Sequence, residues 1–168
     1  YFMYRKIFFH PERCMFCLSC VLACETNSLG LSDVHHIPWD GSPCQRLTVT
    51  FHQGTPWVWT CQHCLSAPCV EACINGSLGR EEGEYRITHR PESCVGCGSC
   101  LLVCPYGALI YDEKEEKVHK CNLCPEREIP PCVKACQSKA LVCHEPSHFA
   151  REKGRRFAQE MRRGRERE

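Results

Sequence analysis

The run CVGCGSCLLVCP at residues 94–105 decides how this chain folds. Its cysteines follow the spacing C-x2-C-x2-C-x3-C and a proline comes next, which is the run that holds a [4Fe–4S] cluster in bacterial ferredoxins. The same spacing occurs in CMFCLSCVLAC at residues 14–24. Two stretched variants, CQHCLSAPCVEAC at residues 61–73 and CNLCPEREIPPCVKAC at residues 121–136, delay the third cysteine but keep the final C-x3-C.

Cysteine makes up 18 of the 168 residues, which exceeds the roughly 8–10% level of a cysteine-driven fold. Disulfide frameworks belong to secreted domains, and the N-terminal segment carries no export signal, so we expect no disulfides. Zinc sites use pairs of ligands, whereas these cysteines come in quartets. A zinc-rich structural or nucleic-acid-binding protein stays as an alternative, which broad absorption near about 400 nm would exclude.

Each quartet begins a longer repeat. Closely spaced cysteines in an irregular loop can surround three corners of one cubane, with Gly96 and Gly98 easing the backbone, and the fourth cysteine follows on a short helix. The pattern C-x3-[AS]-L then recurs at Leu29, Leu78, Leu109 and Leu141. Short strands are expected at RKIFFH, RLTVTF, YRITHR, ALIYD and ALVCH, with a hairpin at residues 108–121 that turns at DEKEE. The sequence predicts an α+β, duplicated bacterial 2[4Fe–4S] ferredoxin-like fold that is small and stabilised by its clusters.

The charge balance excludes a generally basic nucleic-acid binder, since 21 Lys and Arg face 20 Asp and Glu. No stretch approaches the roughly 18–20 apolar residues of a transmembrane helix, and we expect a cytoplasmic protein. Four clusters of about −2 each would take the net charge from +1 to about −7. Residues 147–168 remain basic, with eight Lys and Arg against four Asp and Glu.

Over roughly residues 1–145 the chain resembles the four-cluster, ferredoxin-type electron-transfer subunits that serve DMSO reductase, formate dehydrogenase, hydrogenase and CO dehydrogenase. The two stretched quartets are the most specific part of this resemblance. The short length and the closing segment ALVCHEPSHFAREKGRRFAQEM at residues 140–161 are most similar to the ferredoxin-like partner of CO dehydrogenase. One departure is that only Cys104 keeps the proline that follows the last cysteine.

The resemblance implies a nested pairing, in which the first quartet shares ligands with the fourth and the second with the third. We name the four implied ligand sets by their first cysteine. They are the Cys14 set (Cys14, Cys17, Cys20 and Cys136), the Cys61 set (Cys61, Cys64, Cys69 and Cys104), the Cys94 set (Cys94, Cys97, Cys100 and Cys73) and the Cys121 set (Cys121, Cys124, Cys132 and Cys24). Cys44 and Cys143 lie outside the quartets and are expected to be plain thiols.

The same pairing implies how the chain is divided. An outer ferredoxin-like unit would consist of residues 1–29 and 113–146, and an inner unit of residues 61–112. An insertion at residues 30–60 and a basic helical tail at residues 147–168 complete the expected organisation.

The function implied by the resemblance is an electron relay through four [4Fe–4S] clusters. Single electrons would pass between a catalytic subunit, with CO dehydrogenase as the first candidate, and a second redox partner such as a flavin- or NAD-linked oxidoreductase. The chain would then belong to a hetero-oligomer. Alternatives are a formate dehydrogenase or hydrogenase subunit and a free soluble polyferredoxin. The sequence is interpreted as having no G-x-G-x-x-G, P-loop, G-x-S-x-G or H-E-x-x-H constellation and its histidines as dispersed, so no catalytic residue is predicted.

Side chains beside the quartets have two interpretations each. His63 is expected to donate a hydrogen bond or to face a partner rather than to bind iron. Trp57 and Trp59 either have a function, as a shield of a cluster from water or as an anchor of an interface, or pack in the core. Lys120 either eases the negative charge of a cluster or is solvated, and the solvated state is expected.

The tail is predicted to be a helix that begins with Ser147 as N-cap. Phe149, Phe157 and Met161 would share one of its faces. We expect this face to dock on a partner; packing on the ferredoxin body and a frayed terminus are the alternatives.

Overall fold

The computed structural model describes residues 4–38, 46–80, 83 and 85–165, with side chains up to residue 162 in the last helix. Its helices are α1 (Ser19–Ser28), α2 (Pro68–Glu71), α3 (Ser99–Val103), α4 (Pro131–Lys134) and α5 (Pro146–Arg165). Its strands are β1 (Lys6–Phe9), β2 (Leu47–His52), β3 (Thr55–Thr60), β4 (Leu78–Gly79), β5 (Thr88–His89), β6 (Leu109–Asp112), β7 (Lys117–Lys120) and β8 (Leu141–His144). No helix in these ranges combines the length and the apolar composition needed to cross a membrane.

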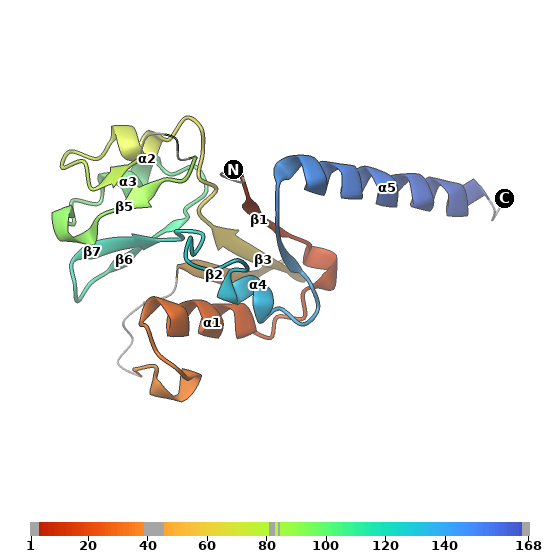
Figure 1. The fold of residues 1–168 in the computed structure, drawn as a ribbon, viewed down its shortest axis with the longest axis horizontal. Helices are drawn as coiled ribbons and strands as arrows, with labels where there is room; N and C mark the ends of the chain where they lie inside the picture. The colour runs from red at the N-terminus through yellow and green to blue at the C-terminus, as the bar shows by residue number, and fades with distance from the viewer. Residues whose placement is uncertain (1–3, 39–45, 81–82, 84, 166–168) are drawn as a thin grey trace.

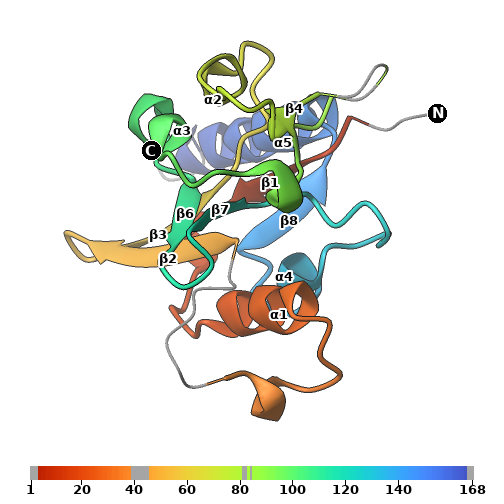
Figure 2. The ribbon, with the colours of Figure 1, turned by 90° about the vertical axis from the view of Figure 1, so that its left-hand side faces the viewer.

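The strands of the described residues pair as antiparallel, two-stranded sheets. The first strand, β1, pairs with the last, β8, so that Lys6 lies opposite His144 and Phe9 opposite Leu141. Helix α1 lies beside α4 at one end of the body, and α2 lies beside α3 at the other (Figures 1 and 2). Elements of the first repeat therefore pack on those of the fourth, and elements of the second on those of the third.

The helices and sheets pack around two small apolar cores, and both cores contain cysteines. One is built around Ile7, Leu123 and Leu141 and includes Cys121, Cys132 and Cys136. The other is built around Leu78, Ile87 and Val118 and includes Cys100. The expected mixture of helices and strands in a small ferredoxin-type domain is confirmed.

The predicted hairpin at residues 108–121 is confirmed by the pairing of β6 with β7. The carboxylate of Asp112, which is 1% exposed, closes the turn because its Oδ1 accepts the backbone N–H groups of Lys114 at 2.8 Å and Glu115 at 3.2 Å. A second hairpin, β2–β3, adds a strand at PWVWT to the one expected at RLTVTF. Its two-residue turn has left-handed φ angles at Gln53 and Gly54, which suits the twist of a tight hairpin.

One backbone feature recurs in all four quartets. The residue just before the second cysteine has a left-handed φ: +55° at Phe16, +46° at His63, +66° at Gly96 and +61° at Leu123. Glycine adopts this conformation freely, whereas each of the other three residues costs about 1–2 kcal/mol. Three quartets thus accept strain to form the same loop, although only the third has glycine there.

The tail helix differs from the prediction at its start. Helix α5 begins at Pro146, and the carbonyl of Glu145 accepts the N–H groups of His148 and Phe149, so Glu145 is the N-cap. The prediction of Ser147 as N-cap is wrong because proline favours the first helical position, where no N–H partner is needed.

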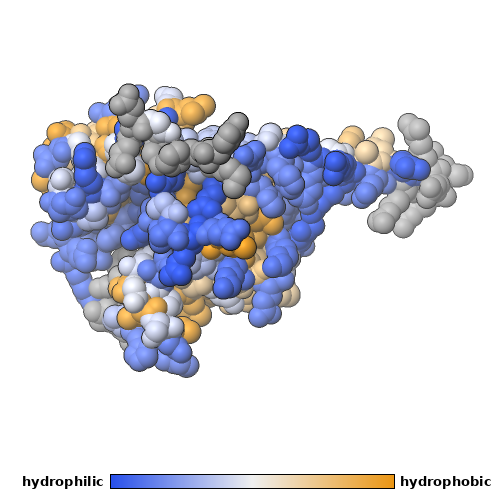
Figure 3. Space-filling model, viewed as in Figure 1, coloured by the Kyte–Doolittle hydropathy of each residue, from blue (hydrophilic) through white to orange (hydrophobic). Residues whose placement is uncertain are grey.

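The predicted face of the tail is divided between two environments. The ring of Phe149 stacks on Phe8 of β1, with centroids 4.0 Å apart. Phe157 and Met161, in contrast, are 63% and 51% exposed. Figure 1 shows α5 projecting well beyond the body, and Figure 3 shows that its visible surface is mostly hydrophilic with a small apolar group near the far end. The first three turns therefore pack on the body, through Phe149 and through Arg156 near Glu12, and the far end of the helix projects beyond it (Figure 1).

Gly96→Ala should destabilise the third quartet far more than Gly107→Ala. Both glycines have left-handed φ angles, so either alanine costs about 1–2 kcal/mol of strain. A Cβ at Gly96 would in addition collide with the backbone carbonyl of Glu116, while a Cβ at Gly107 meets nothing within 4 Å. The check is the half-life of the cluster absorbance of the two holoproteins on heating. Equal half-lives would contradict the predicted collision.

Candidate iron–sulfur sites

Three of the four predicted ligand sets each surround one small cavity. A cavity between β1, the α1 loop and the fourth repeat is lined by Cys14, Cys17, Cys20 and Cys136. A second is lined by Cys61, Cys64, Cys69 and Cys104. A third is lined by Cys73, Cys94, Cys97 and Cys100. In each case the fourth cysteine comes from a different repeat than the other three.

The fourth set also converges, as the mutual electrostatic effects of its thiols indicate. Burial raises the pKa of Cys124 to about 12, and the neighbouring Cys121 and Cys24 add to this rise. Burial likewise raises the pKa of Cys132, again with contributions from Cys121 and Cys24. The thiol of α1 thus lies among those of the fourth repeat.

The donor sets fit [4Fe–4S] clusters. Four thiols around one apolar cavity are the ligands that such a cluster takes, and each cysteine that the structure describes is free of disulfide bonds. Burial also raises the pKa of Cys20, Cys61 and Cys100 to about 11. Iron must therefore displace protons from these thiols when a cluster binds.

The recurring C-x3-[AS]-L pattern has a structural role that the sequence did not reveal. The turn after the fourth cysteine brings a backbone N–H group onto the sulfur of that cysteine. Such N–H···S contacts stabilise a thiolate and influence the reduction potential of its cluster. They run from Leu78 to Cys73 at 3.4 Å, from Ala108 to Cys104 at 3.5 Å and from Leu141 to Cys136 at 3.4 Å.

The first repeat satisfies Cys24 in another way. Helix α1 continues past this cysteine, so the N–H of Leu29 donates to the carbonyl of Glu25 instead. The N–H of Arg46, from the segment before β2, reaches the Cys24 sulfur at 3.4 Å. The insertion between the first two quartets thus contributes to the Cys121 set.

Arg5 holds the stretched loop of the fourth quartet. Its guanidinium donates to the backbone carbonyls of Leu123 at 3.3 Å, Cys124 at 3.2 Å and Arg127 at 2.8 Å. A planar group with five donors can satisfy several carbonyls of one irregular loop. The N-terminal segment therefore shapes a ligand loop at the other end of the chain.

Lys120 lies buried between two ligand sets and is 4% exposed. Its ammonium donates to the carbonyls of Ile87 and Cys121. Burial lowers the pKa of Lys120, and the thiols of Cys61 and Cys121 oppose this effect. The expectation of a solvated lysine is wrong, because the β6–β7 hairpin directs this side chain into the interior.

For His63 and the two tryptophans, the structure excludes one of the two expected roles. His63 is 1% exposed, so it does not face a partner, and its Nδ1 accepts the N–H of Ile87 at 3.0 Å. Burial lowers the pKa of His63 to about 2, which keeps the ring neutral. Trp57 and Trp59 are 43% and 42% exposed, which is not compatible with core packing.

The cysteines outside the quartets are less informative. Cys143 lies in β8, half-buried, and lines none of the three cysteine cavities. Burial raises the pKa of its thiol. Cys44 lies outside the described residues, so its predicted state as a plain thiol stays a prediction.

Comparison with known proteins identifies the class. The 4Fe-4S dicluster domain family matches residues 53–145, and the chain belongs to this family. It is 33% identical over 144 residues to YsaA of Escherichia coli (strain K12), a match that covers 84% of this chain and 90% of YsaA. Its identity to HydN of the same strain, an electron transport protein, is 30% over 177 residues, with 93% of this chain and 98% of HydN covered.

A third relative shows that such a chain can form part of a larger protein. AegA of Escherichia coli (strain K12) is 31% identical over 147 residues, which cover 83% of this chain but only 22% of AegA. The chain is therefore a [4Fe–4S] ferredoxin-type electron transport protein. The activity of the whole protein and its partners are proposed below.

Cys24→Ser should perturb the cluster of Cys121, Cys124 and Cys132 rather than that of Cys14. Because the Cys24 thiol lies among the thiols of the fourth repeat, its loss should have the spectroscopic effect of Cys121→Ser. Electron paramagnetic resonance of the reduced proteins and a comparison of their iron content with that of the wild-type chain measure this.

Cys143→Ser is the control for that comparison and should keep the full iron content. If the resonance changed by Cys24→Ser were the one changed by Cys14→Ser, the nested pairing would be refuted.

Lys120→Met should shift the potential of a neighbouring cluster to more negative values, on the order of tens of millivolts. Removing a buried positive charge favours the oxidised, less negative cluster. Lys153→Met changes the same charge on the exposed tail and should leave all potentials unchanged. Anaerobic redox titration of both variants measures the effect. Equal potentials in the two would show that Lys120 does not act on a cluster.

Proposed function

We propose that this chain relays single electrons through four [4Fe–4S] clusters, held by the Cys14, Cys61, Cys94 and Cys121 sets. The observation that carries the proposal is the convergence of each set of thiols from two repeats, three of the sets around a cavity of their own. The chain would act as a carrier, with catalysis in a partner subunit. The division into an outer and an inner ferredoxin-like unit is part of this proposal.

The contacts between sets support a linear path. Burial raises the pKa of Cys132 in the Cys121 set, and Cys20 of the Cys14 set adds to this rise. Cys61 in turn has Cys121 as an electrostatic neighbour. The Cys61 and Cys94 sets pack on one apolar core, which includes Cys69 and Cys100. The proposed order is thus Cys14 set, Cys121 set, Cys61 set and Cys94 set.

Solvent exposure supports the same order. Cys17 and Cys97 are exposed, and they belong to the two terminal sets. Each cysteine of the two middle sets is half-buried or buried. Exposed apolar side chains lie beside both exposed thiols: Met15 is 67% exposed and Val95 57%. Electrons would enter at one of these surfaces and leave at the other.

The finer identity of the partner rests on the family resemblance. A CO dehydrogenase is the first candidate, and a formate dehydrogenase or hydrogenase is the alternative, with a flavin- or NAD-linked oxidoreductase as the second partner. The similarity to HydN, an electron transport protein, supports the carrier role and gives no support to a CO dehydrogenase in particular. Purification of the native protein under anaerobic conditions, followed by assays of the co-purified subunits for CO, formate and hydrogen oxidation, distinguishes them. Isolation of the chain alone, still able to reduce several enzymes, would favour a free polyferredoxin.

Loss of the projecting part of α5 should weaken assembly with the partner and leave the clusters in place. Phe157→Ala with Met161→Ala removes two exposed apolar side chains from a helix segment that lies outside both cores. Iron content should therefore be unchanged, while co-purification of the catalytic subunit falls several-fold, as for the loss of interface anchors. Gln159→Ala, on the opposite face of the same turns, is the control.

Unchanged co-purification of the double variant would retire the docking role of the tail. A loss of iron would show instead that this part of α5 supports the body.

A further inference from the structure

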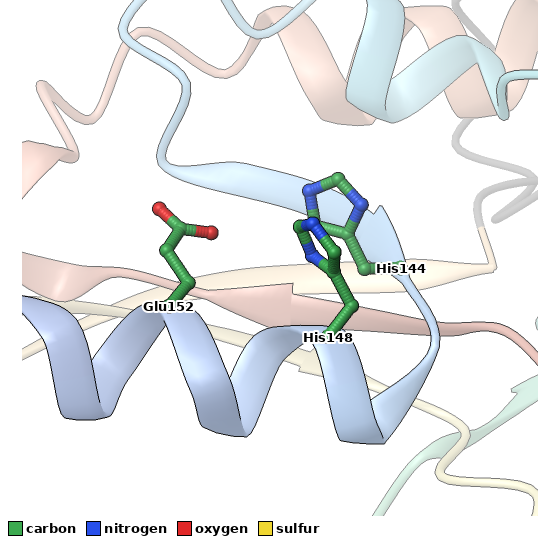
Figure 4. A group of neighbouring side chains, drawn as sticks. All are labelled: His144, His148 and Glu152. Carbon is green, nitrogen blue, oxygen red and sulfur yellow. The ribbon is translucent and has the colours of Figure 1, made fainter.

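Three metal-binding side chains lie together where β8 leads into α5, apart from the cysteine-lined cavities. His144 is the last residue of β8, and His148 and Glu152 follow at intervals of four residues on α5. Their ligand atoms all lie within 4.8 Å of one another. Figure 4 shows His148 and Glu152 on the same side of the helix, with His144 extending from the end of the strand above them. The interpretation of the histidines as dispersed, with no H-E-x-x-H pattern among them, is wrong for this pair.

The local sequence accounts for this arrangement. Residues 144–148 read H-E-P-S-H, which is the H-E-x-x-H spacing of paired zinc-binding histidines. Here Pro146 starts the helix, so His144 stays on the strand, yet the two imidazole centroids are only 4.6 Å apart. Glu145 is exposed, caps the helix and lies outside the group, so the catalytic glutamate of that motif has no counterpart at the site.

The donor set suits a divalent transition metal. Two imidazole nitrogens and a carboxylate oxygen bind zinc at about 2.0–2.2 Å, and three such ligands with a water complete a tetrahedron. Ligand atoms on a tetrahedron of that size are about 3.3–3.5 Å apart, so small side-chain rotations would close the observed separations. Cys143 precedes His144 on an extended strand, where successive side chains point to opposite faces, so Cys143 is not part of this donor set.

Two positive groups border the site without occupying it. Arg156 donates to Oε1 of Glu152 at 2.8 Å and also approaches Glu12 at 3.7 Å. The contact with Arg156 uses one carboxylate oxygen of Glu152, and the other oxygen can bind a metal ion. Lys6 lies opposite His144 in the β1–β8 register, but its ammonium sits over the ring of Tyr4, 5.4 Å from the centroid.

We propose that His144, His148 and Glu152 bind one divalent transition-metal ion of the zinc type, which fixes the first turns of α5 to the end of β8. Helix α5 meets the body through Phe149 on Phe8 and through Arg156 near Glu12. A metal bond between strand and helix would set the direction in which the rest of the helix projects. Metal occupancy would thereby control how the exposed Phe157 and Met161 are presented.

Zinc binding to the full-length holoprotein tests the site. After dialysis against Zn²⁺ and desalting under anaerobic conditions, elemental analysis should find about one zinc per chain besides the cluster iron. His148→Ala, a change at an exposed position, should lower zinc retention at least tenfold with cluster absorbance unchanged. Glu152→Gln should lower it less. His35→Ala removes an exposed histidine far from the site in sequence and should have no effect.

Tryptic cleavage at Arg151 and Lys153 reports on the helix itself. Zn²⁺ should slow this cleavage several-fold in the wild-type holoprotein and not in His148→Ala, because a fixed helix opens less often. Equal zinc retention by the wild type and His148→Ala would place the metal at another site, such as the thiols or the group of Asp112, Glu115 and His119, and would overturn the proposal. Zinc retention without slower cleavage would overturn the fixing role, and zinc uptake with loss of cluster absorbance would identify displacement of iron instead.

Discussion

The structure depends on the convergence of four sets of thiols inside a chain that has little other core. Each apolar core contains cysteines among its buried residues, so the places where a larger domain would pack leucine or valine are here ligand sites. Buried thiols that approach one another raise each other's pKa, and their deprotonated forms would repel. Iron resolves this conflict, and the protein adds N–H groups on Cys73, Cys104 and Cys136.

The strain in the ligand loops follows from the same constraint. The residue before each second cysteine is left-handed whichever side chain the position carries, and in three quartets the cysteine that follows lines the cavity of its set. Phe16 and Leu123 accept this conformation because the loop geometry is imposed by its ends and, in the fourth quartet, by the guanidinium of Arg5. Lys120 adds a positive charge beside thiols of two sets, those of Cys61 and Cys121.

Helix α5 has one part that packs on the body and one part that projects from it (Figure 1). Its first turns rest on β1 through Phe149, and its far end projects beyond the body (Figure 1). Phe157 and Met161 in its later turns are exposed. The junction with β8 is where His144, His148 and Glu152 meet, so a bound metal there would act on the orientation of the helix and not on the electron path. The electron path and the proposed control of docking would therefore be separate in the molecule.

The sequence by itself determined the features that depend on neighbouring residues. Cysteine spacing indicated the cofactor and the short helices. The sequence of residues 108–121 predicted the β6–β7 hairpin, because a turn and its flanking strands interact locally. The tertiary structure decided what depends on residues from opposite ends of the chain. The β1–β8 pairing brings Cys136 to the first quartet and sets His144 above α5, and the β6–β7 hairpin buries Lys120 beside Ile87. Spacing along the chain carries no information on such contacts, since they form only when distant strands pair and the chain closes around the shared sites.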